Sequence, residues 1–254
     1  MKRVYVCSDS ELGIFSAIYD AWMTRMEEEN LGIALRGSVE QELFCEYIEV
    51  EESEKKMLAV QNLIWKHLGE FSYWYIYHTL LSHDDKKGDA VLGMMLESRK
   101  IPNSKKIMEH LTHPKVEKVF SLGRKVSNEA HYYHEFVRFE ELEDGILFSE
   151  IEPKNRIVTC LGNHFTNRFP QENWMIYDKR HDMAIVHEKG KQWILVYGIG
   201  EKLRGKGNVS AEESMYVNLW KAFFTSVSIK ERESYERQRG NLPLKFRDHM
   251  TEFK

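Results

Sequence analysis

The stretch 173–198, NWMIYDKRHDMAIVHEKGKQWILVYG, contains three short apolar runs separated by turn residues. Each run is rich in β-branched and aromatic residues, the types that favour strands. Turns are expected at Lys179–Asp182 and at Lys189–Gly190, because charged residues and glycine interrupt the apolar pattern there. The stretch therefore predicts a three-stranded antiparallel meander.

A hairpin is predicted directly upstream, in RFEELEDGILFSEI at 138–151. Asp144–Gly145 lies between two strand-like runs, and Asp-Gly is the pair that a tight type I′ turn prefers. A helix over about 155–168 is expected between the hairpin and the meander, since its apolar residues recur at helical spacing.

The earlier part of the chain is predicted to be mainly helical. Short strands are expected at Arg3–Cys7 and within 44–50, and Phe71–Leu81 is expected to be a helix buried on nearly every side. Pro114 favours the start of a long helix over 114–137. Strands and helices do not alternate as βαβ units, which places the chain in the α+β class. The predicted fold is an N-terminal mainly helical part followed by an antiparallel sheet (hairpin plus three-stranded meander) packed with helices.

Two parts are expected along the chain. Residues 1–113 form a mostly helical part, and residues 114–254 hold helix, hairpin, helix, meander and a last helix with a basic tail. That last helix is expected to follow a capping box made by Ser210 and Glu213. One continuous domain is the alternative, since no stretch near the boundary resembles a free linker.

Composition excludes several classes of protein. The chain has 254 residues, of which 42% are hydrophobic and 12% aromatic, enough for a packed core. No apolar run approaches the roughly 20 residues of a membrane span, and the N-terminus lacks the pattern of a secretory signal. The three cysteines are far apart and form no CxxC pair. We therefore expect a cytoplasmic protein with no membrane association.

Charge is unevenly distributed along the chain. The formal net charge is −4, yet residues 1–70 hold seven Lys/Arg against fourteen Asp/Glu, whereas residues 99–138 hold nine basic residues against four acidic ones. Residues 221–254 hold eight basic residues against five acidic ones. Such segregation favours basic faces that meet a polyanion. Because the sequence pI is only about 6.3, any nucleic-acid contact is expected to be local.

The basic tail 228–250 interleaves guanidinium groups with the aromatic residues Tyr235 and Phe246. Guanidinium groups bind phosphate and aromatic rings stack on bases, so this mixture suits a nucleic-acid strand. The alternatives are a docking tail for a protein partner and ion pairs that hold the end of the chain against its own surface. Together with two residues of the central region, the candidate nucleic-acid-binding residues are Arg124, Arg138, Arg232, Arg237, Arg239, Lys245 and Arg247.

No catalytic motif of known spacing occurs in the chain. There is no phosphate loop, GxGxxG after a strand, GxSxG or HExxH sequence. The eleven histidines show no ligand spacing that predicts a metal site, and no cofactor is predicted. The enzymatic alternative is a pocket lined by His131, His164 and Arg168, the last two of which are four residues apart on a predicted helix.

Three long blocks of the C-terminal half are distinctive. They are NEAHYYHEFVRFEELEDGILFSEIEP at 128–153, NHFTNRFPQENWMIYDKR at 163–180, and LWKAFFTSVSIKERESYERQRGNLPLKFRDHMTEF at 219–253. In order and spacing they resemble a family of uncharacterised DNA-metabolism proteins linked to a radical SAM protein. In that family the same domain of unknown function also occurs fused to uracil-DNA glycosylases.

The resemblance implies a DNA repair or modification accessory protein that binds DNA and acts with a radical SAM partner. It implies no catalytic mechanism, because the family offers no active site to carry over. The chain departs from the family at Arg232–Tyr235, where relatives usually show Arg-Arg-Asn-Pro. This departure removes positive charge from the tail. The alternatives are a protein-interaction adaptor without DNA contact and the enzyme described above.

Overall fold

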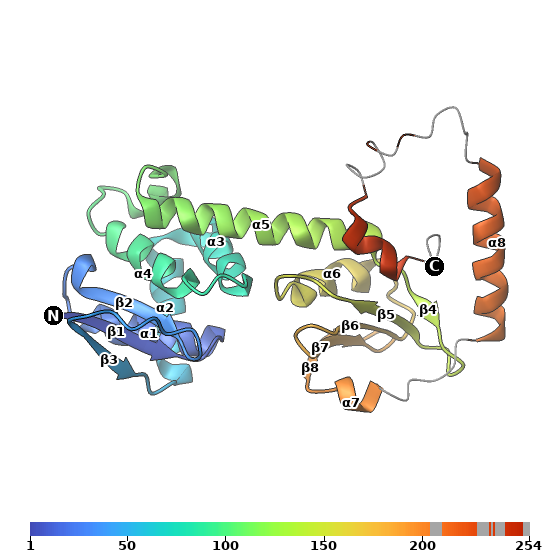
Figure 1. Cartoon of the computed structure of the whole chain (residues 1–254), viewed down its shortest axis with the longest axis horizontal. Helices are drawn as coiled ribbons and strands as arrows, with labels where there is room; N and C mark the ends of the chain where they lie inside the picture. The colour runs from blue at the N-terminus through green and yellow to red at the C-terminus, as the bar shows by residue number, and fades with distance from the viewer. Residues whose placement is uncertain (204–209, 228–233, 235, 237–241, 251–254) are drawn as a thin grey trace. The chain divides into compact units, whose positions relative to one another are not determined.

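The computed structural model of the chain describes residues 1–203, 210–227, 234, 236 and 242–250 (Figure 1). These residues form two compact units, Met1–Asn128 and Glu129–Lys254. Helices and strands occur in both units, which confirms the α+β class, whereas the predicted arrangement is only partly correct. Among the described helices, none has the length and apolar character needed to cross a membrane.

The first unit is mainly helical, as predicted, but its strands form a three-stranded parallel sheet, which was not predicted. The strand order is β2-β1-β3, and both neighbouring pairs are parallel. Helix α1 (Glu11–Met23) connects β1 to β2, which makes the βαβ unit that the sequence pattern did not show. The missed strand, β2, has the sequence LGIAL and is buried at four of five positions, so it lacks the alternation of a half-buried strand. The strands are β1 (Lys2–Cys7), β2 (Leu31–Leu35) and β3 (Cys45–Glu49).

Helices cover this sheet. The Ser10 side chain caps α1 by accepting a hydrogen bond from the Gly13 backbone N–H at 2.9 Å. The buried side of α1 packs on β1 and β2, and α4 packs on β2. Besides α1, the helical segments of this unit that lie before the long helix are η1 (Glu28–Asn30), α2 (Glu54–His67), α3 (Gly69–Leu81), α4 (Lys87–Glu97) and η2 (Ser104–Glu109).

Helix α3 is more exposed than predicted. Ile76 is completely buried, but Phe71 is 63% and Trp74 is 40% exposed. The helix packs on α2, α4 and η2, and Thr79 and Tyr75 contact residues 119–120 further along the chain. Phe71 and Trp74 lie on the part of its circumference that stays exposed. The aromatic side chains on that part pack on one another instead, as the edge-to-face pair of Phe71 and Tyr75 shows. An all-apolar helix is therefore not necessarily buried on every side.

The second unit contains a five-stranded sheet of order β4-β5-β6-β7-β8 (Figure 1). The predicted hairpin and the predicted meander are both present and antiparallel. However, β5 and β6 pair in parallel through helix α6 (Val158–Arg168), so the sheet is mixed and contains a second βαβ unit. The predicted purely antiparallel sheet is therefore wrong at this junction. The strands are β4 (Glu140–Glu141), β5 (Leu147–Ile151), β6 (Trp174–Asp178), β7 (Met183–His187) and β8 (Ile194–Tyr197).

The hairpin turn is longer than the predicted type I′ turn. A type I′ turn needs positive φ at both central residues, whereas here Gly145 has a φ of 76° and Asp144 does not have a positive φ. The Leu142 N–H donates to the Ile146 carbonyl at 3.0 Å, which closes a three-residue loop. The Asp144 carboxylate accepts a hydrogen bond from the Ile146 N–H and so stabilises the loop from its side chain.

The remaining described elements are helical. Helix α5 (Pro114–Phe136) ends within one residue of the predicted helix, and the division between the two units lies inside it. Ser210 accepts a hydrogen bond from the Glu213 N–H, as one half of the predicted capping box requires. Phe246 is only 2% exposed because it packs on aromatic residues at the end of α5. The last described elements are α7 (Gly200–Leu203), α8 (Ala211–Val227) and η4 (Leu244–His249).

Candidate functional site

A cleft of about 990 Å³ lies in the second unit. It is lined by the end of α5 and the segment after it, by β5, and by one side each of α6 and α8. The cleft brings together His131, His164 and Arg168, the residues predicted to line a pocket, and adds Arg138 from the predicted nucleic-acid-binding set. The cleft is therefore the place where the two sets of candidate residues meet.

The floor of the cleft is aromatic. Phe165, on the buried side of α6, is only 3% exposed and meets Phe139 edge-to-face with ring centroids 5.3 Å apart. Phe139 also packs edge-to-face on Phe169 at 5.6 Å. Behind them, Trp174 of β6 is completely buried. Because these rings interlock with the core of the unit, the floor is rigid.

Two histidines stack on one another at one wall of the cleft. The rings of His134 and His164 lie 4.4 Å apart and are inclined by only 19°. The Nε2 atom of His134 lies 3.4 Å from the Cys160 carbonyl oxygen. Burial lowers the pKa of both imidazoles, and the neighbouring Arg168 lowers the pKa of His164 further. Both rings are therefore neutral near pH 7 and present flat, weakly polar surfaces.

His131 has a different partner. Its Nε2 lies 3.3 Å from a carboxylate oxygen of Glu135, one helical turn further along α5. This pair is local, because residues i and i+4 lie on the same side of a helix. His134, which was not among the predicted candidates, stacks on His164 of α6. Its role could be found only from the packing of the two helices.

Two arginines lie at the cleft. Arg138 donates hydrogen bonds from Nη1 to the backbone carbonyls of Glu135 at 2.9 Å and Val137 at 3.3 Å. Arg168 is exposed, and its Cζ lies 5.6 Å from the centre of the Phe169 ring. The carboxylates of Glu135 and Glu213 also line the cleft. The cleft thus combines both signs of charge with an aromatic floor.

Helix α8 supplies an apolar edge of the cleft. Tyr216 is 58% and Trp220 is 43% exposed, and both line the cleft. Leu219 is 58% exposed on the same helix. Apolar residues at helical spacing show which side of a helix is apolar, but spacing alone does not reveal how much of that side is covered.

The other candidate residues are not brought to the cleft. Arg124 is exposed in the first unit, with its Cζ 5.7 Å from the Phe120 ring centre. Arg247 lies in η4 and is half-buried. Arg232, Arg237 and Arg239 lie outside the described residues, and so does the side chain of Lys245.

Comparison with known proteins gives a family but no activity. A solved chain described as a DHH domain of a member of the S1p family of ribosomal proteins is 9% identical, with a TM-score of 0.32 over 73% of each chain. At that score the similarity carries no argument about fold or function. No curated protein matches the sequence. The model of a family described as a domain of unknown function, DUF4130, matches residues 74–252, a span that contains every residue of the cleft. Because this match covers more than half of the sequence, the chain belongs to the DUF4130 family.

Proposed function

We propose that the second unit binds a single-stranded nucleic acid in its cleft, and that the protein is an accessory of DNA repair or modification. The observation that supports binding is the meeting of Arg138 and Arg168 with an aromatic floor and an aromatic edge in one cleft. The assignment to DNA metabolism, and to a radical SAM partner, is supported by the resemblance of the three sequence blocks.

The aromatic and imidazole rings of the cleft are suited to stack on the bases of a nucleic acid. Tyr216 and Trp220 offer exposed rings at the edge of the cleft, and the neutral imidazoles of His134 and His164 offer a further flat surface. Stacking of a base on an aromatic ring contributes about 1–3 kcal/mol and tolerates any base. The cleft should therefore select for unpaired bases rather than for sequence, because bases in a duplex are already stacked.

Phosphates are expected at only a few positions. Arg138 and Arg168 are the arginines that line the cleft, and Glu135 and Glu213 oppose them in charge. With about two phosphates neutralised, the logarithm of the association constant should fall with the logarithm of salt concentration at a slope of about −1.4. Such a slope is much shallower than that of a strongly basic DNA-binding protein.

The test is fluorescence anisotropy of labelled single-stranded and double-stranded DNA over a salt series. The full chain should bind single strands more tightly than duplex, and the double variant Arg138→Ala/Arg168→Ala should remove most of the salt dependence. Lys191→Ala is the matched control, since Lys191 is exposed, pairs with Glu188 at 2.8 Å and does not line the cleft. Absence of binding at low salt, or equal binding by the double variant, would refute the proposal. In that case a protein-interaction adaptor would be the favoured function, and the radical SAM protein becomes the ligand to test.

One observation favours a catalytic alternative. The paired imidazoles are neutral near pH 7, the state in which a histidine acts as a general base. Cys160 does not offer a nucleophile, because burial raises the pKa of its thiol to about 11. Mass spectrometry of an oligonucleotide incubated with the chain separates the two functions. A chemical change that His164→Gln abolishes would identify an enzyme, whereas an unaltered oligonucleotide favours binding alone.

A further inference from the structure

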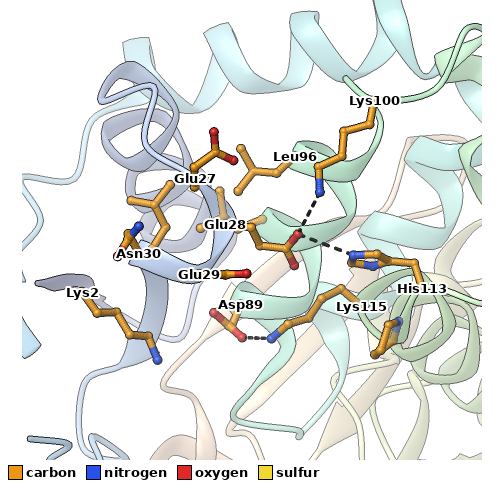
Figure 2. A pocket seen from close by; sticks show the side chains of 14 residues that line it. Lys2, Glu27, Glu28, Glu29, Asn30, Asp89, Leu96, Lys100, His113 and Lys115 are labelled. Carbon is orange, nitrogen blue, oxygen red and sulfur yellow. Dashed lines mark hydrogen bonds and ion pairs between the residues drawn. The ribbon is translucent and has the colours of Figure 1, made fainter.

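The first unit contains a separate cavity of about 650 Å³ (Figure 2). It is lined by the beginning of β1, by η1, by one side of α4 and by the segment that leads into α5. Charged side chains converge here from parts of the chain that are far apart in sequence. This cavity takes no part in the nucleic-acid binding proposed above.

One imidazole and two carboxylates meet beside this cavity: His113 and Glu28 line it, and Glu97 lies next to them. The Nε2 atom of His113 lies 3.5 Å from a carboxylate oxygen of Glu28 and 3.8 Å from one of Glu97. One potential ligand atom from each of the three residues lies within 4.8 Å of the other two. The other ring nitrogen of His113, Nδ1, is fully buried, so Nε2 is the nitrogen that the ring presents to the carboxylates.

These separations are close to those of a metal site. Zinc binds histidine nitrogen and carboxylate oxygen at about 2.0–2.2 Å, so tetrahedral ligands lie about 3.4 Å apart. Small side-chain rotations would bring the three ligand atoms to that separation. The residues come from η1, the end of α4 and the turn before α5, and the fold already holds these segments together.

Gly93 keeps space for this cluster. A Cβ atom on Gly93 would lie 2.9 Å from a carboxylate oxygen of Glu28 and 2.5 Å from Cγ of Lys115. Glycine inside a helix costs about 1 kcal/mol relative to alanine, and here it lies in the middle of α4. The glycine lets the Glu28 and Lys115 side chains approach the backbone of α4 closely, and we infer that this packing offsets the cost.

Lys100 is the present counter-ion of the two carboxylates. Its Nζ lies 3.7 Å from Glu28 (Figure 2). The same Nζ lies 3.0 Å from Glu97, and the lysine side chain is 56% exposed. An exposed ion pair of this kind contributes little, typically about 0–1 kcal/mol. A divalent cation can therefore displace the ammonium group at small cost, and the lysine side chain is free to move into solvent.

We propose that Glu28, Glu97 and His113 bind a first-row divalent cation, with Zn²⁺ bound more tightly than Mn²⁺. The mixed nitrogen and oxygen ligands suit zinc, and the order of affinity follows from the general preference of such ligands. Calcium is disfavoured because it requires six to eight oxygen ligands. With three protein ligands, the ion keeps an open position toward the cavity, as catalytic rather than structural zinc sites do.

Isothermal titration calorimetry of the full chain with zinc chloride tests the proposal. We expect one zinc site that is weakened at least about tenfold by Glu97→Gln and by His113→Gln, as the loss of a direct ligand requires. His110→Gln is the matched control, because His110 is exposed close by and is not part of the cluster. Its affinity should equal that of the unaltered chain. Equal affinity in all three variants would refute the site.

A second variant separates metal binding from damage to the fold. Lys100→Met removes the competing cation, so zinc should bind this variant up to about fivefold more tightly and not more weakly, which is the range that an exposed ion pair allows. Loss of folding cannot produce a gain. Weaker binding by a variant whose urea denaturation midpoint is unchanged would overturn the proposal, because removal of a competing positive charge cannot weaken a cation site that uses these carboxylates.

Discussion

Charged side chains have different neighbours in the cavity of the first unit and in the cleft of the second unit. In the cavity, charged groups meet each other: Lys100 pairs with Glu97, and Lys115 pairs with Asp89. In the cleft, Arg168 lies beside an aromatic ring and Arg138 bonds to backbone carbonyls. Converging carboxylates and an imidazole suit a small cation, whereas guanidinium groups beside rings suit an extended, flat anion. We infer that the kind of ligand each site could bind depends on what surrounds the charged groups as well as on their charge.

The largest effect is expected from Phe165→Ala. Phe165 is 3% exposed and holds the floor of the cleft against Trp174. Loss of such a buried ring costs about 3–5 kcal/mol of the free energy of unfolding. Urea denaturation measures this cost. Binding of DNA should be lost under conditions in which the zinc site of the first unit still titrates normally. Loss of both functions together would contradict the separation of the two sites.

A smaller effect is expected from Gly93→Ala, which acts on the cavity alone. The added methyl group must displace Lys115 and Glu28, which costs about 1–3 kcal/mol against the helix propensity of about 1 kcal/mol that alanine gains. We expect weaker zinc binding and unchanged DNA binding, measured by calorimetry and anisotropy. A variant that is about 1 kcal/mol more stable and binds zinc normally would show that the glycine has no role in the site.

Substitutions in the basic tail 228–250 test whether the cleft alone contacts phosphates. Arg237→Ala/Arg239→Ala changes residues that the sequence predicts to bind phosphate. If both contact phosphates of a single strand, the slope of the salt dependence should become shallower by about 1.4. The measurement is the anisotropy salt series described above. An unchanged slope would limit the phosphate contacts to the cleft.

The smallest expected effect is on the pH dependence of the free energy of unfolding. Because burial lowers the pKa of His134 and His164, the folded protein binds fewer protons than the unfolded chain as the pH falls below about 6.5. This contribution to stability is present above the unfolded pKa and is lost as the pH falls through the folded pKa. Denaturation at several pH values should show a weaker acid dependence for His164→Phe. An identical dependence would mean that the pKa values of these half-buried imidazoles are not lowered in the folded protein.

The sequence predicted those elements whose pattern is local. Helix α5 was placed almost to the residue, because an apolar stripe of helical period runs through its 23 residues and Pro114 marks its start. The cleft was anticipated in part, since His164 and Arg168 share one side of α6. The role of His134 was missed because its partner lies 30 residues away on another helix.

What the sequence determined by itself is therefore the set of periodic elements, including the three strands of the meander. Only the tertiary structure decided which strands pair in parallel, as β5 does with β6, and which side chains from distant segments converge. Glu28, Glu97 and His113 carry no recognisable spacing, yet the fold places them within a few ångströms of one another. The physical reason is that local periodicity specifies which side of an element is buried, whereas the partner on that side is selected by long-range packing.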